Sequence, residues 1–85
     1  MVYVDAPIWP YGRMMMCHMI ADSEDELHSM ADKIGVNRKW VQRTKVTHYD
    51  ICKSKRKLAV SLGAKEVDRE EFVSIMRRIR EKEYR

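Results

Sequence analysis

The chain contains few of the residues that cross-linked or membrane-embedded proteins need. Cys17 and Cys52 are its only cysteines, and no CxxC pair is present. A disulfide framework requires more cysteines and a secreted context, so both are expected to be free thiols. The apolar stretch over residues 14–20 is far shorter than the roughly 20 residues that cross a membrane. Because the first residues resemble folded protein rather than a signal peptide, we expect a cytoplasmic protein without a membrane segment.

Internal repeats and low-complexity segments are also lacking. Of the 85 residues, 45% are hydrophobic and 35% are charged, a balance typical of a folded domain rather than of a disordered chain. This length predicts one domain over residues 1–85 with a modest core. The net charge of +4 allows an anionic partner without requiring one. Much of the excess lies in residues 77–85, where cations also stabilise a helix C-terminus.

Short apolar runs alternate with capped amphipathic segments. A capping box formed by Ser23 and Glu26 begins the first helix, which Gly35 ends, and Asp68 begins the last helix. Strands are expected over residues 2–4, 14–20, 46–51 and 64–67. This order predicts an α/β fold with a small sheet of about four mostly parallel strands and three helices. An antiparallel α+β arrangement is the alternative.

The middle helix begins with an unusual run of positive charge. Ser54 is a good N-cap residue, which would place Lys55, Arg56 and Lys57 at the first three helical positions. Cations there oppose the helix dipole and cost about 0.3–1 kcal/mol each. Free N–H groups and basic side chains together favour an anion, so we predict that these residues bind a phosphate. The alternative is a solvated basic face that binds nothing.

Three carboxylates follow or end predicted strands. They are Asp5, Asp22 and Asp50. In a parallel α/β sheet, ligands bind at the carboxyl ends of the strands, where these side chains and the basic helix start would meet. Mg²⁺ prefers carboxylate oxygens and accompanies phosphates, so the trio is a candidate Mg²⁺ site. Asp22 has an alternative role as a local cap beside Ser23.

The segment His48-Tyr49-Asp50 combines a possible acid or base with a carboxylate. His48 would act as general acid or base, Asp50 would bind metal or orient the base, and Tyr49 would contact the ligand. Simple hydrogen bonding at a strand edge is the alternative. His18 lies in a methionine-rich strand and is either a core residue or a neighbour of this site. A zinc site formed by Cys17, His18, His48 and Cys52 is disfavoured, because Cys17 and His18 project to opposite faces of a strand and no CxxC pair exists.

Aromatic and basic residues occur together in two further segments. Trp9, Tyr11 and Arg13 form one aromatic and basic loop, and Trp40 lies in a polar connection. Such residues can stack on a nucleobase and contact its phosphate. The alternative is that each tryptophan anchors its own loop.

Several short motifs occur in combination along the chain. They are Val2-Tyr3-Val4-Asp5, Gly12-Arg13, His18 with Ala21-Asp22, Glu26-Leu27-His28, Ile34-Gly35, Trp40 with Gln42, His48-Tyr49-Asp50, Lys55-Arg56 and Gly63-Ala64. In this combination, over roughly residues 2–67, the chain resembles the bacterial and phage domain-of-unknown-function family DUF4031. The resemblance implies a shared fold and a polar surface built from these positions, and it implies no activity.

These observations lead to three functional hypotheses. The first is a domain that binds a phosphate-bearing ligand, either a nucleotide or a nucleic-acid backbone, through Lys55, Arg56 and Lys57. The second is a metal-assisted phosphoesterase or nuclease that uses Mg²⁺. The third is a protein-interaction module or inhibitor, which a phage origin would suit.

Overall fold

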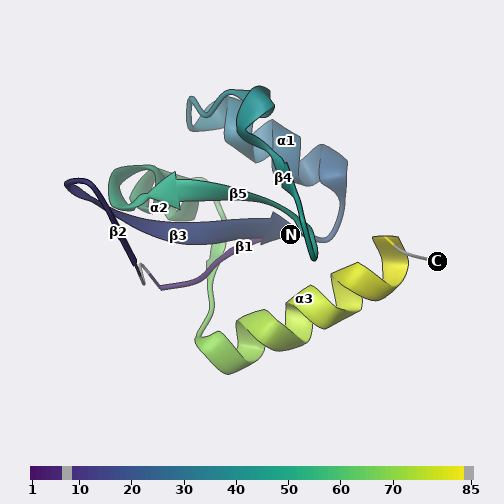
Figure 1. Cartoon of the computed structure of the whole chain (residues 1–85). Helices are drawn as coiled ribbons and strands as arrows, with labels where there is room; N and C mark the ends of the chain where they lie inside the picture. Colours follow the sequence, from purple (N-terminus) through teal and green to yellow (C-terminus); the bar gives the residue numbers. More distant parts are fainter. Residues whose placement is uncertain (7–8, 84–85) are drawn as a thin grey trace.

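The computed structural model describes residues 1–6 and 9–83, apart from the side chains of Trp9 and Glu83. Within these residues, a single sheet lies between helices on its two faces (Figure 1). The elements in chain order are β1 (Val2–Val4), β2 (Trp9–Tyr11), β3 (Met14–Ala21), α1 (Glu24–Lys33), the 3-10 helix η1 (Arg38–Trp40), β4 (Gln42–Arg43), β5 (Thr47–Cys52), α2 (Lys53–Ser61), β6 (Lys65–Glu66) and α3 (Arg69–Glu83).

The sheet has six strands in the order β4-β5-β3-β1-β6, with β2 paired to β3. Four strand pairs are antiparallel, and β1 with β6 is the parallel pair in the described sheet. The prediction of about four mostly parallel strands is therefore wrong, whereas the α+β alternative fits.

Two short strands account for the difference. Residues 9–11 and 42–43 were expected to be connections, yet β2 and β4 pair with β3 and β5. β4 forms a hairpin with β5 and so reverses the chain once more after α1. As a result, β5 runs antiparallel to β3 although a helix lies between them in the sequence.

Alternate residues of the strands divide the core between the two faces of the sheet. On one face, α1 and α2 cover Val4, Met19 and Tyr49, all of which are fully buried. On the other face, α3 packs Phe72, Ile75 and Ile79 against a second cluster that includes Tyr3 and Ile20. Other side chains on this second face of the sheet are polar, and they form the candidate site.

The helix boundaries agree with the sequence signals for α1 but not for α2. The Ser23 Oγ accepts a hydrogen bond from the backbone N–H of Glu26 at 3.3 Å, and Gly35 follows the helix with a φ of 75°. Helix α2, however, begins at Lys53, with Cys52 as its N-cap residue and no side-chain cap. The prediction that Ser54 caps this helix is wrong. The Ser54 hydroxyl instead lies 3.2 Å from the Cys52 Sγ.

Candidate metal centre

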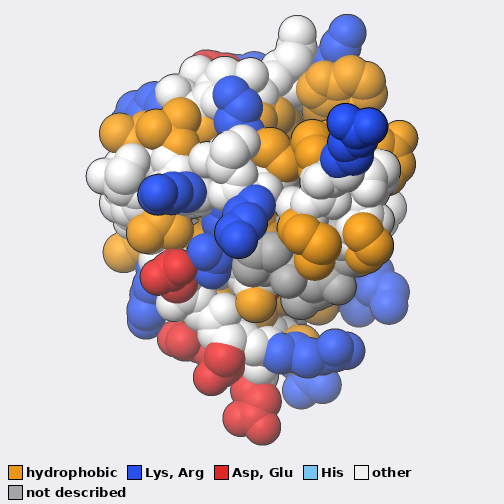
Figure 2. Space-filling view, turned by 90° about the vertical axis from the view of Figure 1, so that its left-hand side faces the viewer, with side chains coloured by type: hydrophobic (Ala, Val, Ile, Leu, Met, Phe, Trp, Pro, Cys, Tyr) orange, Lys and Arg blue, Asp and Glu red, His pale blue; other side chains and the backbone are white. Residues whose placement is uncertain are grey.

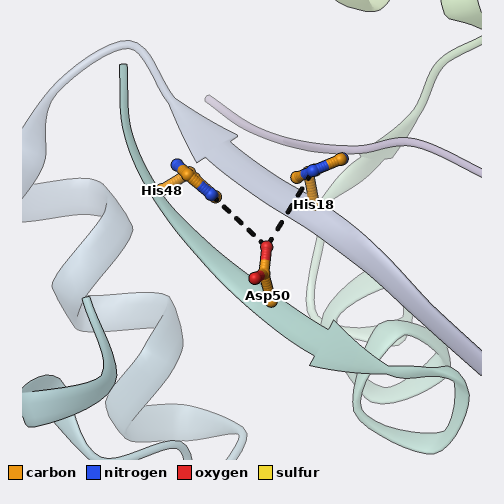
Figure 3. Close-up of side chains that lie close together, drawn as sticks. All are labelled: His18, His48 and Asp50. Carbon is orange, nitrogen blue, oxygen red and sulfur yellow. Dashed lines mark ion pairs between the residues drawn. The ribbon is translucent and has the colours of Figure 1, made fainter. Parts of the chain in front are cut away.

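Four polar residues lie side by side on the face of the sheet that α3 covers. His18 of β3 is paired with Asp50 of β5, and Asp5 lies across from His18 just after β1. His48 precedes Asp50 by two residues and projects to the same face. The antiparallel pairing of β3 with β5 thus brings His18, His48 and Asp50 together (Figure 3).

Asp5 fixes the orientation of the His18 imidazole. Its Oδ2 lies 2.8 Å from the His18 Nδ1, and its Oδ1 accepts from the His18 backbone N–H at 2.6 Å. Asp5 is almost fully buried, with 6% of its surface exposed. Because Nδ1 donates to this carboxylate, the lone pair of a neutral His18 is on Nε2. That Nε2 lies 3.9 Å from the Asp50 Oδ1.

His48 is oriented in the same way by the backbone. Its Nδ1 lies 2.9 Å from the carbonyl oxygen of Val46, which can only accept a hydrogen bond. The lone pair of a neutral His48 is therefore also on Nε2, which lies 3.3 Å from the Asp50 Oδ1. When both imidazoles are neutral, each therefore presents its unprotonated nitrogen to the same carboxylate.

Asp50 offers one free oxygen to these nitrogens. Its Oδ2 accepts a hydrogen bond from the Gln42 side-chain amide at 2.5 Å. Its Oδ1 is buried and has no hydrogen-bond partner within residues 1–6 and 9–83. A buried carboxylate oxygen without a partner is costly, so this atom is suited to a cation that would lie between the three side chains.

The geometry of the three side chains suits a transition metal. One ligand atom from each of His18, His48 and Asp50 lies within 4.8 Å of the others. Ligands of a tetrahedral Zn²⁺ lie about 3.3–3.4 Å apart, given bonds of about 2.0–2.1 Å. The 3.3 Å separation at Asp50 matches this spacing, whereas the 3.9 Å separation must shorten when a metal binds. Two imidazoles and a carboxylate favour Zn²⁺, Mn²⁺ or Fe²⁺ over Mg²⁺, and three ligands leave a position for water or substrate.

A cavity of about 390 Å³ opens beside the two imidazoles. Its walls come from the sheet face and from the first half of α3, and Phe72 lies with its ring centroid 5.8 Å from that of His18. Lys45 and Arg69 also line it. In the part of the chain that the structure describes, neither forms an ion pair.

Ionisation at the site follows from these contacts. The hydrogen bond to Asp5 raises the pKa of His18 above its ordinary value, although burial opposes the shift. Burial raises the pKa of the nearby Cys17 thiol to about 12, so Cys17 is not a thiolate ligand. Cys17 also projects to the opposite face of β3, as the sequence indicated.

The predicted carboxylate trio is not assembled. Asp5 and Asp50 both lie at the site, but Asp5 holds His18 rather than offering free oxygens. Asp22 follows the far end of β3, where it accepts from Arg78 at 2.6 Å and from the Tyr3 hydroxyl at 3.0 Å. Antiparallel pairing separates these strand ends, so the structure does not bring the three carboxylates together.

The basic helix start is separate from the cluster. Helix α2 packs on the opposite face of the sheet. Arg56 donates to the Asp5 backbone oxygen at 2.7 Å and to Glu66 at 2.8 Å, so its charge is already paired. The Lys55 Nζ lies near Gly35, 3.2 Å from where a Cβ would stand. Lys57 is exposed, and the predicted pocket shared by these cations and Asp50 is not present.

The remaining predicted ligand residues lie elsewhere as well. Tyr49 is fully buried under α1, where its hydroxyl lies 2.6 Å from the His28 Nδ1, and burial raises its pKa. Trp40 is 63% exposed in η1, with the Lys39 ammonium 5.1 Å from the centroid of its ring. Arg13 is exposed in the β2–β3 turn, and the side chain of Trp9 lies outside the described residues.

The surface around the hairpin turn and α2 mixes positive charge with apolar side chains. Figure 2 shows Lys and Arg interleaved with hydrophobic groups on the side of the molecule that carries β2, and Asp and Glu gathered toward one end. Tyr11, Met14, Met15, Leu58 and Leu62 are its exposed apolar members.

Sequence reasoning identified His48 and Asp50 but gave His18 only a secondary place. The spacing of two residues between His48 and Asp50 in a strand was a usable signal, because it places both side chains on one face. The roles of the Val46 carbonyl, Lys45 and Arg69 were missed. Nothing in the sequence indicates that α3 brings Arg69 over the site.

Comparison with known proteins places the chain in a family without assigning an activity. No curated protein and no solved structure matches it. None of the described helices is long and apolar enough to cross a membrane. The model of a family described as a protein of unknown function (DUF4031) matches residues 2–79. This match extends beyond the motifs noted in the sequence and covers most of the chain. The chain therefore belongs to the DUF4031 family.

Proposed function

We propose that the chain is a metal-dependent phosphoesterase whose metal is held by His18, His48 and Asp50. One observation carries this proposal: two imidazole nitrogens and a buried carboxylate oxygen without a hydrogen-bond partner converge within 4.8 Å beside a cavity. The proposal keeps the phosphate-bearing ligand expected from the sequence and moves it from the start of α2 to this cluster.

The charges around the cavity explain why a metal would be needed. Asp5 and Asp50 contribute two negative charges, which the positive charges of Lys45 and Arg69 balance when both imidazoles are neutral. A phosphate would therefore meet no net attraction in the metal-free site. A divalent cation bound to neutral imidazoles would make the site positive, so phosphate binding should depend on metal.

The chemistry follows from the open coordination position. A metal held by His18, His48 and Asp50 would lower the pKa of a water at that position, so that hydroxide would be available near neutral pH. The resulting hydroxide would attack phosphorus, and the ester P–O bond would break with its electron pair on the leaving oxygen. That oxygen takes a proton from solvent, so the products are an alcohol and phosphate. Lys45 and Arg69 would stabilise the charge that develops on the phosphoryl oxygens.

Turnover of p-nitrophenyl phosphate tests the proposal. We expect hydrolysis after addition of Mn²⁺ or Zn²⁺ to the chelator-treated protein, and none without metal. Asp50→Asn should lower the rate by on the order of 100-fold or more, because a bound metal supplies several kcal/mol of transition-state stabilisation. Asp25→Asn is the matched control on the exposed face of α1 and should stay within about twofold. Equal activity of the Asp50 variant and the control would rule out this site.

A further inference from the structure

The cavity beside the cluster has two chemically different parts. His18 and His48 line it together with Asp5, and Lys45 and Arg69 supply positive charge. The rest of the lining is mainly apolar: Ala6, Ile20, Val46, Phe72, Val73 and Met76. A ligand that fills this space must therefore combine an anionic group with an apolar one.

The dimensions of the cavity limit the size of that ligand. A volume of about 390 Å³ lies near the lower end of the roughly 300–1,000 Å³ that small-molecule sites occupy. The sheet forms one wall, and Arg69, Phe72, Val73 and Met76 of α3 form the other. A space bounded in this way suits one compact molecule, whereas a nucleic-acid strand needs an open positively charged groove that follows its backbone.

We infer that the substrate is a small phosphate monoester whose ester group is an aryl or compact alkyl group. This inference rests on the proposed function and specifies its substrate. The phosphate contacts the metal, Lys45 and Arg69, and the ester group packs between Phe72, Val73 and the sheet. The apolar wall supplies affinity by removing the ester group from water.

The test compares the affinities of three probes for the Zn²⁺-loaded protein by isothermal titration calorimetry. The probes are inorganic phosphate, phenyl phosphate and a ten-nucleotide oligothymidylate. We expect phenyl phosphate to bind at least about tenfold more tightly than inorganic phosphate, as burial of an aromatic ring predicts. The oligonucleotide should bind more weakly than phenyl phosphate.

Two variants locate the apolar contact. Val73→Trp should fill the cavity and remove the preference for phenyl phosphate, with Zn²⁺ and inorganic phosphate affinities within about twofold of the unmodified protein. Ser74→Trp, at the neighbouring exposed position of α3, is the control and should keep the preference. If Val73→Trp fails to fold, Met76→Ala serves instead, because it removes part of the same wall and should also reduce the preference.

The outcomes separate this inference from the proposed function. Absence of Zn²⁺ binding would contradict the proposed function itself. Zn²⁺ binding with equal affinities for phosphate and phenyl phosphate, or with tighter oligonucleotide binding, would overturn the substrate inference alone. A preference for phenyl phosphate that survives in Val73→Trp would also overturn the substrate inference.

Discussion

Replacing His48 by Ala is expected to reduce the affinity for Zn²⁺ by about 100-fold or more. The loss follows because His48 Nε2 is one of three ligand atoms, and the Val46 carbonyl already holds its ring in the binding tautomer. Isothermal titration calorimetry on chelator-treated protein would measure the change. An affinity within threefold of the unmodified protein would show that His48 is not a ligand.

His28 provides the control for this variant because it is the one remaining histidine besides His18 and His48. It lies on α1, hydrogen-bonded to Tyr49 and Glu24, on the opposite face of the sheet. His28→Gln should lower thermal stability through loss of contacts to the buried Tyr49. Below its melting temperature, however, it should bind Zn²⁺ with nearly unchanged affinity.

Replacing Asp5 by Asn is expected to weaken Zn²⁺ binding by roughly 10–100-fold, although Asp5 is not among the three ligands proposed from the structure. Its carboxylate holds the Nδ1 of His18 and raises the pKa of that imidazole. The amide would hold the ring less firmly and would not stabilise the imidazolium. The pKa of His18 should therefore fall toward its ordinary value, which an NMR titration of the imidazole would show. An unchanged pKa in the variant would contradict this role of Asp5.

The raised pKa of His18 also sets the direction of two pH effects. Protonated His18 binds Asp5 in the folded state, so this contribution to stability is fully present below the ordinary pKa of 6.5. It is lost as the pH rises through the raised pKa. Zn²⁺ affinity should instead increase as the pH rises through this pKa. Protonated His18 carries its second proton on Nε2, the nitrogen that binds metal. Asp5→Asn should remove most of this pH-dependent stability contribution and should move the transition in Zn²⁺ affinity to lower pH.

The helices were predictable where local signals decide the structure. Ser23 and Glu26 define the start of α1, and the Asp68 side chain accepts from the backbone N–H of Glu71 at 2.8 Å at the start of α3. Strand direction was not predictable, because it depends on β2 and β4. Those strands span three and two residues, and Pro10 in β2 is typical of a loop.

The site was predictable only in part, because its assembly also depends on strand direction. His48 and Asp50 share a face through their spacing along β5, which sequence alone reveals. His18 joins them only through the register between β3 and β5. The error in strand direction also placed Asp22 at the wrong end of the sheet and α2 beside the site. Residues 53–57 do carry a run of positive charge, but the hydrogen bonds of Arg56 indicate that part of this charge stabilises the fold.

The most direct test of the account is the position of a bound metal. Anomalous X-ray diffraction from crystals grown with Zn²⁺ should give one strong peak about 2.0–2.2 Å from the His18 Nε2, the His48 Nε2 and the Asp50 Oδ1. A peak at other residues, or no peak at this cluster under saturating Zn²⁺, would contradict the proposed metal centre.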